Sequence, residues 1–104
     1  MSKPQRQDIT AIIYDKRGRV LSVAKNDYLR SHPLQGFHAK KVGQEHRIYL
    51  HAEIHAIVKC KDIEKAHRIR VFRFYKDGSE ALAKPCDVCM SAIKSTNIKV
   101  IEHT

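Results

Sequence analysis

The first apolar residues of the chain predict two short strands. Residues 9–15 are rich in the β-branched residues Ile and Thr, which are typical of a buried strand. The polar turn Lys16-Arg17-Gly18-Arg19 follows, and residues 20–26 form a second largely apolar stretch. Because Gly18 suits a tight turn, we expect a hairpin in which the two strands run antiparallel.

A long polar segment, residues 27–46, separates this hairpin from the next apolar stretch. Pro33 and Gly36 argue against one continuous helix from its start, so we expect only a short helix around residues 37–42. A connection of this length in a compact domain usually forms a binding loop or a wall of an active site. We therefore expect residues 27–46 to line a substrate pocket.

The second half of the chain alternates between helices and strands. Apolar residues at helical spacing predict a helix over residues 50–63, and a looser alternation predicts a strand over residues 68–75. A second helix is expected over residues 86–95 and a last strand over residues 98–102. The chain thus alternates strand, strand, helix, strand, helix and strand.

This order of elements predicts an α/β fold with a mixed sheet of about four strands. The first strand is expected to run antiparallel to the rest. Pro85 suits the first position of the second helix, and Asn97 suits a left-handed residue at its end. Because parallel crossovers are right-handed, both helices should lie on one face and begin at the same edge of the sheet. Ligands usually bind at that edge.

Composition limits the class of protein. We expect residues 1–104 to form a single domain with 42% hydrophobic and 30% charged residues, as in soluble globular proteins. No apolar run approaches the roughly 20 residues that cross a bilayer, and the polar start does not resemble a signal peptide. A cytoplasmic location is the resulting expectation, with no membrane partner. The 3 cysteines do not suggest a disulfide framework.

The formal net charge of +9 is large for 104 residues. It is compatible with an anionic partner, such as a nucleotide phosphate or a nucleic-acid backbone. It is equally compatible with an ordinary charged surface, because the Lys and Arg residues are scattered along the chain. Charge alone does not decide between these interpretations.

Two short motifs carry the candidate chemistry. His51-Ala52-Glu53 begins the first predicted helix, and Cys86 and Cys89 lie three residues apart at the start of the second. One imidazole and two thiolates predict one Zn²⁺ per chain, with a water or hydroxide as the fourth ligand. Glu53 is not needed as a ligand, so it is the candidate catalytic residue that holds and moves a proton.

The motifs resemble those of the cytidine and deoxycytidylate deaminase superfamily, of which this chain looks like a short form. The resemblance covers nearly the whole domain and rests on Leu50-His51-Ala52-Glu53-Ile54-His55-Ala56-Ile57, Lys84-Pro85-Cys86-Asp87-Val88-Cys89 and Val23-Ala24-Lys25-Asn26. It implies the three-layer type of α/β fold of that family. It also implies that Asn26 contacts the substrate near its sugar and that the backbone at Ala52 recognises the base.

Several alternatives stay open. His55 lies four residues after His51, so a closed structural zinc site with four protein ligands is a rival to the catalytic site. Cys60 falls out of step with the ligands and is expected to be a small buried apolar residue. Phe72, Phe74 and Tyr75 are expected to belong to the core, although aromatic rings also stack on bases.

The favoured function is the hydrolytic deamination of cytosine to uracil in free nucleotides or nucleosides, with deoxycytidylate first. Alternatives are a polynucleotide deaminase acting on single-stranded DNA or on transfer-RNA adenosine, and a non-catalytic zinc-bound module that binds nucleotides or nucleic acid. The family sheet usually has five strands with helices before the first and after the last. One face of a four-stranded sheet would therefore stay poorly covered, and we expect a homo-oligomer that buries it.

Overall fold

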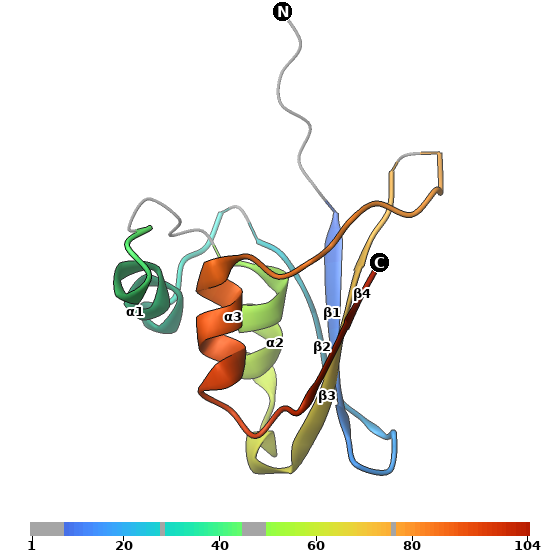
Figure 1. Cartoon of the computed structure of the whole chain (residues 1–104), viewed down its shortest axis with the longest axis horizontal. Coiled ribbons are helices and arrows are strands. Elements are labelled where there is room, and N and C mark those ends of the chain that lie inside the picture. The colour runs from blue at the N-terminus through green and yellow to red at the C-terminus, as the bar shows by residue number, and fades with distance from the viewer. Residues whose placement is uncertain (1–7, 28, 45–49, 76) are drawn as a thin grey trace, which may run out of the picture.

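A computed structural model describes residues 8–27, 29–44, 50–75 and 77–104, and it shows a four-stranded sheet with helices (Figure 1). The order of the strands across the sheet is β2-β1-β3-β4. Their bounds are β1 Ile9–Asp15, β2 Val20–Lys25, β3 Ala66–Arg73 and β4 Val100–His103. The described residues thus form the sheet of about four strands that the sequence predicted.

Strand β1 runs antiparallel to both of its neighbours, β2 and β3, and β3 pairs with β4 in parallel. The first strand is thus antiparallel to the other three, which confirms the expected mixed sheet. Because β2 and β3 run in the same direction, the segments that leave them emerge at the same edge. The helices that follow these segments begin at this edge.

The helices of the described chain lie on one side of the sheet (Figure 1). Their bounds are α1 Pro33–Lys41, α2 Ala52–Lys59 and α3 Asp87–Lys94, with a 3-10 turn at Ile63–Lys65. Helix α2 packs on β1 and β2, α3 packs beside α2, and α1 packs against α3. The prediction that both motif-bearing helices share one face is confirmed. None of these helices is long and apolar enough to span a membrane.

The predicted helix around residues 37–42 begins four residues earlier than expected. Pro33 occupies the first turn of α1, where a missing N–H is tolerated, and Gly36 lies within the helix. The N–H of Leu34 donates to Nδ1 of His32 at 3.0 Å, so the His32 side chain caps the start of the helix. Because histidine is an unusual cap and glycine is unusual inside a helix, the sequence pattern predicted a later start for this helix than the structure shows.

The ends of the other elements also differ from expectation. Helix α2 stops at Lys59 rather than near residue 63, and α3 is capped by Cys86, so Pro85 lies before the helix and not in its first turn. Asn97 does not adopt a left-handed conformation, because only glycines have positive φ among the described residues. Helix α3 instead ends at Lys94, and the C-cap residue Ser95 donates its N–H to the carbonyl of Ala92.

The core lies between the sheet and the helices α2 and α3. Alternate residues of β1 and β3 face this layer, and their largest members, Ile13 and Ile69, are fully buried. Ile54 of α2 and Ile93 of α3 meet them from the helical side, also at 0–1% exposure. Burial of these side chains holds α2 and α3 together against the sheet.

Candidate metal centre

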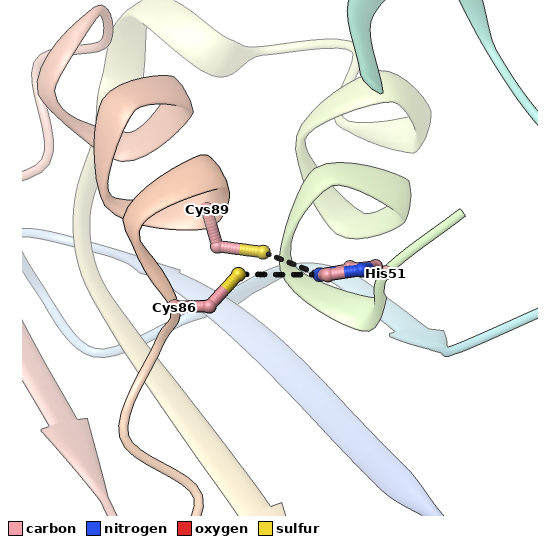
Figure 2. Close-up of side chains that lie close together, drawn as sticks. All are labelled: His51, Cys86 and Cys89. Carbon is pink, nitrogen blue, oxygen red and sulfur yellow. Dashed lines mark hydrogen bonds between the residues drawn. The ribbon is translucent and has the colours of Figure 1, made fainter. Parts of the chain in front are cut away.

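His51, Cys86 and Cys89 meet where α2 and α3 begin (Figure 2). His51 is the N-cap residue of α2, Cys86 is the N-cap residue of α3, and Cys89 lies in the first turn of α3. The two helices start at the same edge of the sheet, so residues far apart in the sequence face one another. Cys89 is fully buried and His51 is 8% exposed.

The distances between these side chains suit a single zinc ion. Nδ1 of His51 lies 3.2 Å from Sγ of Cys89 and 3.5 Å from Sγ of Cys86. The three ligand atoms all lie within 4.8 Å of one another. A tetrahedral zinc with ordinary Zn–N and Zn–S bonds separates its nitrogen and sulfur ligands by about 3.6 Å. The group is therefore positioned to hold one Zn²⁺ through Nδ1 of His51 and both sulfurs.

The protonation of the two thiols is coupled. A hydrogen bond from the thiol of Cys89 lowers the pKa of Cys86 to about 3, which favours the thiolate. The pKa of Cys89 is raised well above its ordinary value, because its proton is shared with Cys86 and its side chain is buried. Zinc binds thiolates, so zinc held by this site would displace the proton of Cys89.

His55 is turned away from this group. Its Nδ1 lies 2.7 Å from the backbone carbonyl oxygen of Lys25, at the end of β2. Within the described residues, the cluster of possible metal ligands contains His51, Cys86 and Cys89 but not His55. The closed site with four protein ligands is therefore not formed. Cys60, by contrast, is buried in the hydrophobic core as expected.

Glu53 lies in the first turn of α2, two residues after His51, and is only 5% exposed. Burial raises the pKa of its carboxyl group, and its own backbone N–H, His51 and Cys89 partly offset this increase. A buried carboxyl group with a raised pKa beside a metal site is suited to accept and release a proton.

A cavity of about 150 Å³ opens beside the candidate metal centre. The predicted residues Asn26, His51, Ala52, Glu53 and Cys86 all line it. The remaining residues of the wall were not predicted as site residues; they are Ile9, Arg73, Leu82, Ala83 and Lys84. Of these residues, Lys84 lies two residues before Cys86. A basic side chain this close to a metal-ligand motif is the one feature of the sequence that could have indicated a residue of the cavity wall.

The expectation that residues 27–46 line the pocket is wrong for the described part of that segment. Residues 27 and 29–44 do not belong to the cavity wall, and residues 28, 45 and 46 lie outside the described residues. Helix α1 instead contacts the backbone of His51 and a side chain of α3. The backbone N–H of His51 donates to Oε1 of the fully buried Gln35 at 3.2 Å, and Nδ1 of His38 lies 2.8 Å from Oγ of Ser91 in α3.

The mixed sheet, the paired helix starts and the His/Cys/Cys group define a zinc-binding α/β domain. Residues 1–103 match the family described as the cytidine and deoxycytidylate deaminase zinc-binding region. The chain therefore belongs to this family, which supports a hydrolytic deaminase that acts on nucleotides or nucleic acid. Comparison with curated proteins finds no matching sequence.

Proposed function

We propose that this protein deaminates cytosine to uracil in free nucleotides or nucleosides, with deoxycytidine compounds as the first choice. The observation that carries the proposal is the buried Glu53 in the wall of a cavity that also contains His51 and Cys86. A structural zinc site has no need of an unligated buried carboxyl group next to an open cavity. The location in the cytoplasm stays a prediction.

His51, Cys86 and Cys89 would hold the zinc ion, which when bound supplies a Lewis acid that lowers the pKa of a coordinated water. Glu53 would accept a proton from the attacking water and deliver it to the ring nitrogen next to the amino-bearing carbon, while the water oxygen bonds to that carbon. Glu53 would then move the proton of the new hydroxyl group to the amino group, so that the C–N bond breaks, ammonia leaves and the ring carbonyl forms. One carboxyl group serves as base and acid, and its raised pKa assists both steps.

The cavity supports a division of the substrate into an enclosed base and an outer sugar. Its volume of about 150 Å³ is below the range of roughly 300–1,000 Å³ that encloses a complete small ligand. The base therefore occupies the cavity beside the backbone of Ala52. The sugar lies at the mouth, where Asn26 is half-buried at the end of β2.

A polynucleotide substrate is the second candidate. Phe74 and Tyr75, just beyond the end of β3, are 48% and 55% exposed and are not core residues. Exposed aromatic rings near a small base-sized cavity suit stacking on the bases that flank a target nucleotide. The net charge of +9 adds a general attraction for a phosphate backbone.

The test measures ammonia release by the zinc-loaded protein. The substrates are cytosine and adenine nucleosides, their 5′-monophosphates and short single-stranded oligonucleotides. Glu53→Gln removes the proton carrier with little change in size, and we expect it to lower kcat at least ~100-fold while zinc stays bound. Glu64→Gln is the matched control, because Glu64 is exposed at the far end of the sheet.

Each outcome decides between the candidates. Turnover of free cytosine nucleotides or nucleosides supports the proposal, and turnover of oligonucleotides alone favours the second candidate. An absence of turnover on every substrate would favour a zinc-bound module without catalysis. Equal turnover by wild type and Glu53→Gln would refute the role of Glu53.

A further inference from the structure

Two cationic side chains, Arg73 and Lys84, stand in the wall of the cavity beside the candidate metal centre. Among the described residues of this wall, the only acidic one is the deeply buried Glu53. We propose that Arg73 and Lys84 bind the 5′-phosphate of a nucleoside monophosphate. The inference rests on the proposed function, and it selects nucleotides over nucleosides as the substrate class.

The strand order places Arg73 at the distance that a nucleotide requires. Asn26 follows the end of β2, Ile9 begins β1, and Arg73 ends β3, so the three residues form a row across one edge of the sheet. The N–H of Asn26 donates to the carbonyl of Ile9 at 3.2 Å, the N–H of Ile9 donates to Oδ1 of Asn26 at 3.2 Å, and Ile9 pairs with Arg73. The backbones of Asn26 and Arg73 are therefore separated by two strand spacings, or about 10 Å.

That spacing leaves room for a sugar and its phosphate between the two side chains. A sugar held at Asn26 directs its 5′-substituent along the row toward β3, while its base points into the cavity. Arg73 has a long side chain that reaches inward from the other end of the row. Asn26 and Arg73 can therefore hold opposite ends of the same sugar phosphate.

The backbone around Arg73 is firmly anchored. Its N–H donates to Oγ1 of Thr104 at 3.1 Å, and its carbonyl accepts from the N–H of Ala81 at 2.8 Å. The hydroxyl of Thr104 also donates to the carbonyl of Ala81 at 2.6 Å, and the N–H of Ala83 donates to the carbonyl of Thr104 at 2.9 Å. These bonds join the end of β3 to the segment that carries Lys84, so both cations project from one supported wall.

The charges of Arg73 and Lys84 are not neutralised within the described chain. Nη1 of Arg73 donates to the carbonyl of Leu82 at 3.4 Å, and its guanidinium carbon lies 5.9 Å from the centre of the Tyr75 ring. Neither residue belongs to any ion pair between described side chains. A guanidinium has five N–H donors, so most of them are available to a ligand.

The chemistry of the pair fits a terminal phosphate. The planar guanidinium matches two phosphate oxygens at once, and Lys84 adds a compact second charge. A phosphate monoester carries nearly two negative charges at pH 7, whereas each phosphodiester of a polynucleotide carries one. Two cations without carboxylate partners therefore favour the monoester.

The experiment compares deoxycytidine 5′-monophosphate with deoxycytidine. Steady-state kinetics are measured for the zinc-loaded wild type, Arg73→Gln, Arg73→Lys and Lys84→Gln. Arg17→Gln is the matched control, because it removes the same charge from an exposed turn at the other end of the sheet. Calorimetry measures binding of both compounds to Glu53→Gln with and without Arg73→Gln, so that the result does not depend on turnover.

We expect Arg73→Gln to lower kcat/KM for the monophosphate by ~10- to 100-fold, mainly through KM. The kcat/KM for deoxycytidine should change by no more than about twofold, since the nucleoside lacks the phosphate that Arg73 would bind. Lys84→Gln should have a smaller effect in the same direction, and Arg73→Lys an intermediate one. The calorimetric dissociation constant for the monophosphate should rise by the same factor.

An equal effect on both compounds would overturn the inference, as would an effect of Arg17→Gln as large as that of Arg73→Gln. Turnover of both compounds with no change in Arg73→Gln refutes the phosphate site and leaves the proposed function intact. If neither compound is deaminated, the proposed function fails, and calorimetry alone decides: Arg73-dependent binding of the monophosphate sustains the site, and its absence removes it.

Discussion

Nδ1 of His55 lies 2.7 Å from the backbone carbonyl oxygen of Lys25, although His55 is only four residues from the metal-ligand candidate His51. The bond ties α2 to the end of β2 and points the His55 ring away from the sulfurs of Cys86 and Cys89. Among the described residues, three side chains are therefore placed to ligate the candidate zinc position. An open fourth position distinguishes a catalytic zinc site from a structural one.

The first prediction follows from this bond. His55→Ala should retain one zinc per chain, whereas His51→Ala and Cys89→Ser should lose most of it, because only the latter two remove ligand atoms. Elemental analysis of the purified variants measures the zinc content. Loss of zinc from His55→Ala, with the fold retained by circular dichroism, would show that His55 is a ligand.

The metal-ligand candidates were predictable because their spacing is local. His51 and Glu53 lie within one turn of each other, and Cys86 and Cys89 lie on one face of α3, so residue type and separation were sufficient. Arg73 was not predictable in this way. It reaches the cavity because β3 pairs with β1 and because Thr104 and Ala81 hold the end of β3, and these contacts join distant parts of the chain.

The strands were predictable for a similar reason, since alternation is a property of neighbouring residues. The start of helix α1 was not predictable in this way, because it depends on the His32 ring accepting a bond from the N–H of Leu34, a cap that histidine seldom provides. The supporting role of α1 at the metal centre was not predictable for another reason. Gln35 contacts the backbone of His51 inside the protein, and a polar residue in a polar segment gives no sign of burial.

The second prediction concerns that contact. Gln35→Leu removes the oxygen that accepts from the N–H of His51, and it should lower the free energy of unfolding by about 1–3 kcal/mol. Zinc affinity should fall by ~10- to 100-fold, as when other supports of metal ligands are removed. Chemical denaturation and competition with a zinc chelator measure the two effects. Lys40→Gln, at an exposed position of α1, is the control, and equal behaviour of both variants would contradict the prediction.

The third prediction is a dependence of stability on pH at Asp15, in the turn far from the metal centre. The N–H of Arg19, aided by its guanidinium and by the N–H of Arg17, holds the pKa of Asp15 below its ordinary value of 3.8. At pH values between the lowered pKa of the folded state and the pKa of the unfolded chain, the unfolded state binds more protons than the folded state. The stability from Asp15 is therefore complete above the pKa of the unfolded chain and is lost as pH falls through the folded pKa.

Urea denaturation of wild type and Asp15→Asn at several pH values tests this. The wild type should be more stable by a constant amount between about pH 5 and 7, and the difference should shrink below about pH 4. A difference that stays constant down to pH 3 would show that the hydrogen bonds at Asp15 do not depend on its charge.

The fourth prediction is that copies of this chain associate through the open face of the sheet. Side chains alternate along β1, so Ile12 faces away from the helices that cover Ala11 and Ile13. Val23 pairs with Ile12 on this face and is 45% exposed, and Val100 of β4 is 38% exposed. Aliphatic side chains on an uncovered sheet are stabilised when a second copy removes them from water.

Light scattering at micromolar concentration should therefore give a mass above that of one chain. Val23→Glu should shift the protein toward the monomer, because the new carboxylate would have to be desolvated in the interface. Val58→Glu is the matched control: Val58 is 39% exposed on α2, on the helical side of the sheet, and its substitution should leave the mass unchanged. A wild-type monomer would refute the association, and dissociation by Val58→Glu alone would move the interface from the sheet to the helices.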